Sequence, residues 1–151
     1  MTAREQAALD FFERGYNCAQ AVAAAFADVT PLDESTILRL SSSFGGGIGR
    51  LREVCGAVSG MALIAGLLYG YDDPEDQTVK ADHYTRIQEM AAAFTRENGA
   101  LRCADILNRP GKEPPTPAKR DAAFYHERPC ARCVTSAARI LEEYIAAHPL
   151  A

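Results

Sequence analysis

The sequence predicts an all-α fold, a single-domain bundle of about six to eight helices around a buried central helix at about residues 54–69. Ala, Leu, Glu, Arg and Gln, which favour helices, dominate the chain. Runs that alternate apolar and polar residues and are rich in β-branched side chains are missing. The segment 54–69 is apolar on nearly every side, which is typical of a helix buried by its neighbours. The length of 151 residues fits one domain over residues 1–151.

The N-terminal half predicts three helices before the central one. The first spans about residues 2–14, and Asn17 can cap a second helix that ends before Pro31. Asp33 can cap a third. The glycine cluster at 45–49 then breaks the helical pattern, so we expect the central helix to begin after it.

The C-terminal half predicts four further helices and one long loop. Asp73 and Pro74 form a typical helix start, and Asn98-Gly99 a typical helix end. The remaining elements are a short helix at about 101–107, an extended proline-rich loop at 108–117, a short helix near 118–125, and a last helix from Pro129 to about 147.

Charge and hydropathy exclude several classes of protein. A net charge of -4 argues against nucleic-acid binding, which usually requires a basic face. The longest apolar run falls short of the roughly 18 residues that span a bilayer. Residues 1–6 carry charges of both signs and no apolar core, which is unlike a signal peptide. These features predict a cytoplasmic protein that neither inserts into a membrane nor binds nucleic acid.

Five cysteines are numerous for a chain of this kind. They are Cys18, Cys55, Cys103, Cys130 and Cys133. Structural disulfides are rare in the cytoplasm, so several cysteines favour metal binding or thiol redox chemistry. Only Cys130 and Cys133 form a compact CxxC motif, and a zinc ribbon would need a second one. A metal site would therefore have to be assembled by the tertiary fold.

Four of the cysteines fall in the first turn of a predicted helix. The free N–H groups and the positive dipole end of a helix start stabilise a thiolate, which is the nucleophilic and metal-ligating form. The alternative is that these cysteines are small buried hydrophobic residues. Arginines lie within four residues of each of the four, although chance explains much of this in an arginine-rich chain; they are Arg14, Arg52, Arg102 and Arg128.

Several motifs together resemble one known family. They are Gly15-Tyr16-Asn17-Cys18-Ala19-Gln20, Phe44-Gly45-Gly46-Gly47-Ile48-Gly49, Cys55-Gly56-Ala57-Val58-Ser59-Gly60, the single cysteines Cys103 and Cys130, and Ala138-Arg139-Ile140-Leu141-Glu142-Glu143. In order and spacing they resemble the C-GCAxxG-C-C family, whose members are described as redox-active, over nearly the whole chain. The resemblance implies that Cys18, Cys55, Cys103 and Cys130 are the functional set, with Cys133 an addition.

The same family is similar to a domain of split-Soret cytochromes, which carry haem and non-haem iron. Covalent haem is not expected in this chain, because Val134 rather than histidine follows Cys133. The glycines Gly45, Gly46, Gly47 and Gly56 are candidate cofactor-binding residues, whose backbone amides could hydrogen-bond to cluster sulfurs. A tight turn between two packed helices is the alternative explanation for the glycine cluster.

Three functional hypotheses follow from the cysteines. The first is a metal site, an iron–sulfur cluster or another cysteine-bound metal, with Cys18, Cys55, Cys103 and Cys130 as ligands for electron transfer. The second is a metal-free thiol–disulfide protein that pairs Cys130 with Cys133, or Cys55 with Cys18. The third is a helical module with structural zinc. The first two predict an oxidoreductase or electron carrier with an unnamed redox partner, and the apolar helices are compatible with a homodimer.

Overall fold

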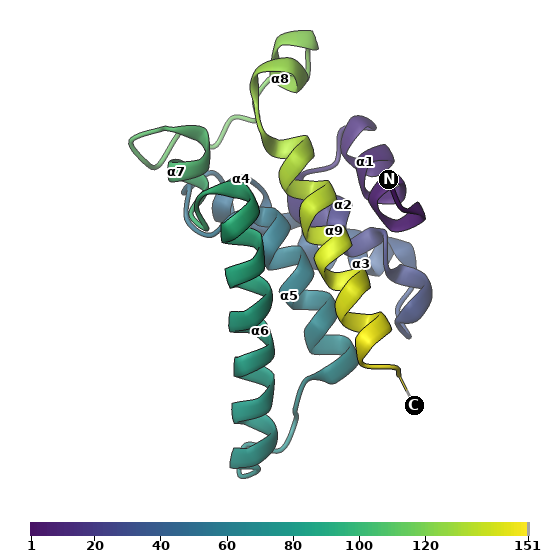
Figure 1. The fold of residues 1–151 in the computed structure, drawn as a ribbon. Helices are drawn as coiled ribbons and strands as arrows, with labels where there is room; N and C mark the ends of the chain where they lie inside the picture. Colours follow the sequence, from purple (N-terminus) through teal and green to yellow (C-terminus); the bar gives the residue numbers. More distant parts are fainter. Residues whose placement is uncertain (151) are drawn as a thin grey trace.

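The computed structural model describes residues 1–150 and confirms the predicted all-helical single domain. Figure 1 shows the helices and their labels. The regular α-helices are α1 (Ala3–Glu13), α2 (Cys18–Ala24), α3 (Glu34–Ser41), α5 (Gly56–Tyr69), α6 (Gln77–Asn98), α7 (Cys103–Leu107), α8 (Ala122–Glu127) and α9 (Cys130–Ala147). The short segment α4 (Gly45–Ile48) contains left-handed backbone at Gly46 and Gly47. No strand is present within the described residues.

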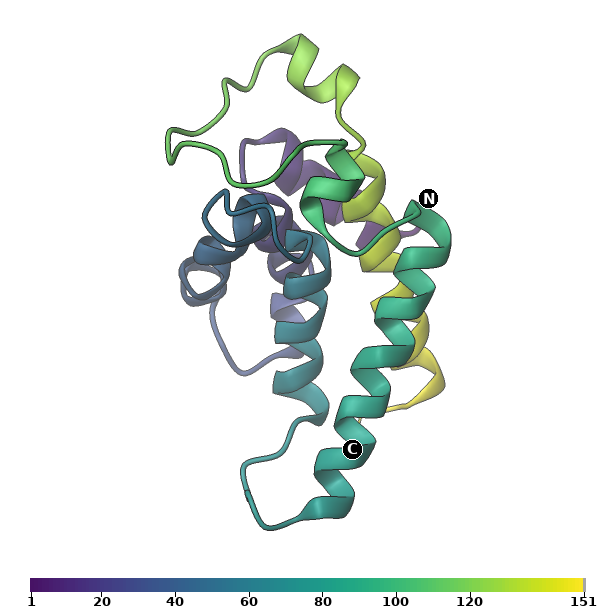
Figure 2. The same cartoon turned by 90° about the vertical axis from the view of Figure 1, so that its left-hand side faces the viewer.

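Helix α5 is the central helix that the sequence predicts. It packs against α2, α6 and α9, and Figures 1 and 2 show it running between α6 and the N-terminal helices. Ala57, Ile64 and Ala65 are fully buried, whereas Leu67 in the last turn is 40% exposed. Burial is therefore complete only over the earlier turns. Neither α5 nor another helix in residues 1–150 is long and apolar enough to cross a membrane.

Side-chain caps set the start of several helices. The Asn17 side chain accepts a hydrogen bond from the Gln20 N–H at 2.9 Å, and the Gln20 side chain in turn accepts one from the Asn17 N–H. Asp33 caps α3 through the Thr36 N–H, as predicted. These caps fix where the short helices begin, which positions the residues that follow them.

Some predicted helix boundaries are wrong. Helix α6 begins at Gln77 rather than at Pro74, because Asp73 accepts from the Glu75 N–H in a turn and Asp76 caps the helix instead. Helix α8 begins at Ala122, later than predicted, because Asp121 is its cap. Helix α2 stops at Ala24, and a single 3-10 turn at 27–29 follows it.

Helices α2 and α5 approach each other closely at Gly60. A Cβ atom at this position would lie 2.6 Å from the backbone oxygen of Ala19. That separation is too short for a carbon–oxygen contact, and the backbone cannot rotate away as a side chain can. The glycine therefore allows the two helices that carry Cys18 and Cys55 to pack together.

We expect Gly60→Ala to lower the free energy of unfolding by about 1–3 kcal/mol, because the added methyl overpacks the α2–α5 contact. The matched control is Gly66→Ala in the same helix, where a Cβ meets nothing within 4 Å. There, alanine should raise stability by up to about 1 kcal/mol through helix propensity. Urea unfolding of both variants gives the comparison, and equal effects would contradict the close approach.

Candidate functional site

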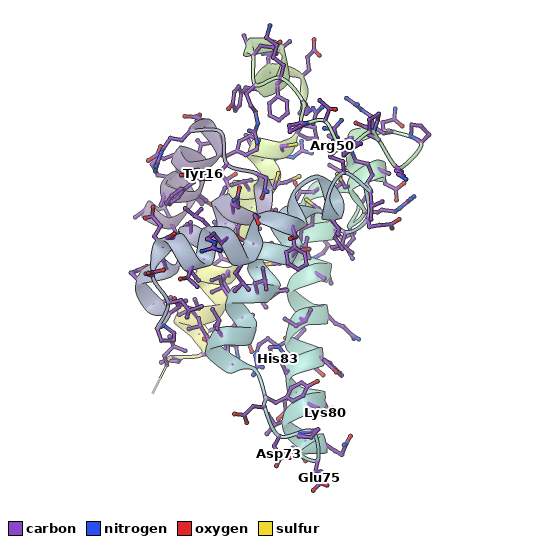
Figure 3. All side chains as sticks on the ribbon, turned by 180° about the vertical axis from the view of Figure 1, so that it is seen from behind. Tyr16, Arg50, Asp73, Glu75, Lys80 and His83 are labelled. Carbon is purple, nitrogen blue, oxygen red and sulfur yellow. The ribbon has the colours of Figure 1, made fainter. Side chains whose placement is uncertain are left out.

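The four cysteines predicted at helix starts all lie at helix starts in the structure. Cys18, Cys103 and Cys130 are the first residues of α2, α7 and α9, and Cys55 is the N-cap of α5. Tyr16 and Arg50 lie within a few residues of Cys18 and Cys55 in the sequence. Figure 3 shows them toward one end of the molecule and His83 toward the other. The helix starts therefore gather the cysteines at one end of the bundle.

A short backbone bridge joins the starts of α5 and α7. Val54 and Arg102 form an isolated antiparallel bridge. Beside it, the Cys55 N–H donates to the Leu101 oxygen at 2.9 Å, and the Cys103 N–H donates to the Glu53 oxygen at 2.6 Å. These bonds hold two cysteines that are far apart in sequence next to each other.

The glycine cluster folds back on this bridge. Gly46 and Gly47 have φ of +67°, and their oxygens accept from the N–H groups of Arg52 and Glu53. A Cβ on Gly47 would lie 2.6 Å from the Glu53 nitrogen. The cluster thus has a packing role that does not depend on a ligand. Binding of a cofactor by Gly45, Gly46, Gly47 or Gly56 stays a prediction.

Cys18 and Cys130 form an outer pair, and both are half-buried. The Cys18 thiol hydrogen-bonds to the Cys130 sulfur and, with nearby Arg128, Arg52 and Arg120, lowers the pKa of Cys130 to about 7. The same hydrogen bond, followed by burial, raises the pKa of Cys18. At neutral pH Cys130 is therefore partly ionised, whereas Cys18 keeps its proton.

Cys55 and Cys133 form an inner pair, and both are buried. The neighbouring Cys133 lowers the pKa of Cys55, assisted by the backbone N–H groups of Ala57 and Val58 at the start of α5. The Cys133 thiol donates to the Asn98 Oδ1 at 3.7 Å, and its pKa is raised by Cys55 and by burial. Cys55 is therefore the cysteine of this pair that ionises more readily.

Cys103 faces an arginine instead of a cysteine. The Arg52 Nη1 lies 3.4 Å from the Cys103 sulfur. Burial raises the pKa of Cys103 more than the arginine lowers it. Cys103 is therefore a protonated thiol at neutral pH, and it lies beside an arginine instead of forming part of either pair.

The pKa shifts link Cys18 most strongly to Cys130 and Cys55 most strongly to Cys133. The pairings favoured by the sequence, Cys130 with Cys133 or Cys55 with Cys18, stay predictions beside these two. A CxxC motif at a helix start is a common redox pair, so a Cys130–Cys133 disulfide is the alternative that any experiment on these cysteines has to distinguish.

A cavity of about 210 Å³ adjoins the cysteines. Cys18, Cys55 and Cys103 line it. Four arginines also line it: Arg50, Arg52, Arg120 and Arg128. Of these, sequence proximity to the cysteines pointed to Arg52 and Arg128. Arg50 and Arg120 gave no sequence signal, because the loops that carry them reach the site only through the tertiary fold.

The proline-rich loop closes over the cavity through one carboxylate. Glu113 accepts from Arg50 and from Arg52, each at 2.9 Å, and from Arg109 at 3.1 Å. Arg50 also donates to the Pro114 oxygen at 2.7 Å. Glu113 thereby ties the loop to the turn that follows the glycine cluster, and its pKa is lowered chiefly by Arg52.

The arrangement of the sulfurs bears on the predicted metal site. Within residues 1–150, no three His, Cys, Asp or Glu side chains are placed to hold a metal ion. The sulfurs are arranged as two facing pairs and one cysteine beside an arginine. An iron–sulfur or other metal site at Cys18, Cys55, Cys103 and Cys130 stays a prediction from the sequence.

Comparison with protein families gives one match. The model described as "Putative redox-active protein (C_GCAxxG_C_C)" matches residues 16–144. Comparisons with curated proteins and with solved structures gave no match. The matched residues contain all five cysteines and most of the chain. This chain therefore belongs to the C_GCAxxG_C_C family of redox-active proteins.

Proposed function

We propose that the protein is a thiol–disulfide oxidoreductase whose outer pair, Cys18 and Cys130, exchanges electrons with a disulfide. One observation carries the proposal: the half-exposed Cys130 faces the thiol of Cys18, and the pKa of Cys130 is about 7. A thiol with a pKa near the ambient pH is both ionised and nucleophilic. Cys18 stands beside it as the resolving thiol.

The reaction of the outer pair balances with a disulfide as oxidant. The Cys130 thiolate attacks one sulfur of the substrate, forms a mixed disulfide and releases a thiolate. That thiolate takes the Cys18 proton. Cys18 then attacks the Cys130 sulfur, closes the Cys18–Cys130 disulfide and releases the second substrate thiolate. Two electrons leave the protein, two cysteines are oxidised, and one substrate disulfide is reduced.

The inner pair extends the same chemistry inward. The charge on Cys130 raises the pKa of Cys55, and the charge on Cys55 raises that of Cys18, which places the two pairs close together. The Cys55 thiolate can attack one sulfur of the Cys18–Cys130 disulfide and form a mixed disulfide with it. Cys133 can then attack the Cys55 sulfur of this mixed disulfide and release the outer cysteine. The outer pair is reduced again, and the disulfide lies between Cys55 and Cys133. The protein would hold two disulfides when fully oxidised, with Cys103 left as a thiol.

The pH dependence of alkylation tests the low pKa of Cys130. The rate of its reaction with iodoacetamide should rise with pH to half its maximum near pH 7, because only the thiolate reacts. Cys18→Ala removes the main hydrogen bond, so the midpoint should move upward. Cys103→Ala is the control and should move it far less. A wild-type midpoint at the usual cysteine value of about 8.5 would contradict the assignment.

A redox titration tests the function itself. Protein purified without oxygen is equilibrated with a series of dithiothreitol buffers, and free thiols, iron, zinc and acid-labile sulfide are measured. We expect five thiols per reduced chain to fall reversibly to one. Stoichiometric iron and sulfide would overturn the proposal in favour of a cluster. A thiol count that does not change with the buffer would overturn it as well.

A further inference from the structure

The cavity beside the cysteines has a lining rich in positive charge. The chain has a net charge of -4, yet four arginines and no carboxylate line this cavity. Glu113 reaches Arg50 and Arg52 from outside the lining. Arg120 and Arg128 form no ion pair within residues 1–150. Such a concentration of one charge in a concave site attracts ions of the opposite charge.

Two of these arginines are held against the same aromatic ring. The guanidinium carbons of Arg120 and Arg128 each lie 4.4 Å from the centroid of Phe124. Arg120 also donates to the backbone carbonyl oxygen of Tyr16 at 3.0 Å. These contacts fix two like charges near one another with no carboxylate paired to either, and the thiol of Cys130 is the acidic group nearest to them. A bound anion would add to this stabilisation.

A third arginine that lines the cavity is almost fully buried. The Arg52 side chain is 3% exposed, and its Nε has no hydrogen-bond partner among the described residues. Its two terminal nitrogens are already engaged by Glu113 and Cys103. A buried donor without an acceptor is rare in folded proteins. The Nε atom has almost no surface accessible to solvent, so Arg52 contributes its charge to the cavity and not a free donor.

We propose that this cavity binds a carboxylate arm of a small anionic disulfide, which is the oxidant of the Cys18–Cys130 pair. The inference rests on the proposed function and names its substrate class. The volume of about 210 Å³ equals that of about seven liquid waters, which suits one short arm of such a molecule. Cys18 lines the cavity, and Arg128 precedes Cys130 by two residues. An arm held by the arginines therefore brings its sulfur to the outer pair.

Three aliphatic disulfides, each with two methylenes between the sulfur and the end group, test the effect of charge. They are dithiodipropionate, which is dianionic, hydroxyethyl disulfide, which is neutral, and cystamine, which is dicationic. The rate at which each oxidises the reduced protein is divided by its rate with free 2-mercaptoethanol, which removes intrinsic reactivity. We expect dithiodipropionate to exceed the neutral compound by about tenfold or more, with cystamine the slowest.

Variants at Arg128 identify the source of the preference. Arg128→Gln should reduce the ratio of dithiodipropionate to hydroxyethyl disulfide about tenfold, whereas Arg128→Lys should retain most of it. The ratio cancels any effect of the substitution on cysteine reactivity, because both substrates meet the same thiolate. Arg96→Gln, at an exposed position on α6 outside the cavity, is the matched control and should leave the ratio unchanged.

Binding without reaction keeps this inference separate from the proposed function. Suberate replaces the sulfur pair of dithiodipropionate with two methylenes and cannot be reduced. By calorimetry we expect one suberate per reduced chain, bound about tenfold more weakly by Arg128→Gln and unchanged by Cys130→Ser. Equal corrected rates for the three disulfides, or no suberate binding, would overturn the anionic substrate alone. Failure of all three disulfides to oxidise the protein reversibly, with suberate still bound, would overturn the thiol function alone.

Discussion

Cys130→Ser should slow the oxidation of the protein by a disulfide about a thousandfold or more. Serine hydroxyl is not ionised at neutral pH, and Cys18 then loses the thiolate with which it shares a hydrogen bond. The rate is measured by stopped-flow with hydroxyethyl disulfide in excess at pH 7. The variant should still fold, because serine is smaller than cysteine and residue 130 is only half-buried.

Cys103→Ser is the matched control for this experiment. Cys103 lies in the same cluster but faces Arg52 instead of a thiol. Its replacement should leave the rate within a fewfold of the wild-type value. Equal losses in the two variants would show that the cluster acts as a whole, which would contradict a dedicated outer pair.

Glu113→Gln should lower the free energy of unfolding by about 3 kcal/mol, the largest stability effect that we expect at the site. The glutamate is the acidic partner of Arg50, Arg52 and Arg109, and Arg52 is almost fully buried. Glutamine keeps the shape but leaves these cations without a counter-charge. Glu75→Gln, at an exposed position without an ion pair in the described residues, is the control and should change stability little.

The same carboxylate makes stability depend on pH in a defined direction. Arg52 lowers the pKa of Glu113 in the folded state below its ordinary value of 4.5. The stabilisation is therefore present above the unfolded-state pKa and is lost as the pH falls through the folded-state pKa. The stability difference between the wild type and Glu113→Gln should shrink in acid. A difference that is the same at pH 7 and pH 3 would contradict the role of this ion pair.

Local sequence features predicted the parts of the fold that depend on near neighbours. Asn17 and Asp33 could be identified as caps because a capping side chain bonds to the backbone three residues later. The placement of Cys18, Cys55, Cys103 and Cys130 at helix starts followed from the same signals. The boundary at Pro74 was wrong because Asp73 and Asp76 are both adequate caps, and the turn between them decides which one is used.

The pairing of the sulfurs could not be predicted from the sequence. The CxxC spacing favours Cys130 with Cys133, but the partner of each is set by which helix packs beside α9. Cys18 arrives with α2 and Cys55 with α5, and the close approach at Gly60 fixes both helices. The cavity arginines could not be predicted for the same reason. Arg50 and Arg120 line one cavity only because the tertiary fold brings the loops that carry them to the same place.

Peptide mass spectrometry of the oxidised protein tests the central claim most directly. The protein is oxidised with hydroxyethyl disulfide, free thiols are blocked at low pH, and the cross-linked peptides are identified. We predict a Cys18–Cys130 disulfide that forms first, a Cys55–Cys133 disulfide that follows, and Cys103 as a free thiol. A Cys130–Cys133 disulfide, or a disulfide that includes Cys103 as the main product, would contradict the account.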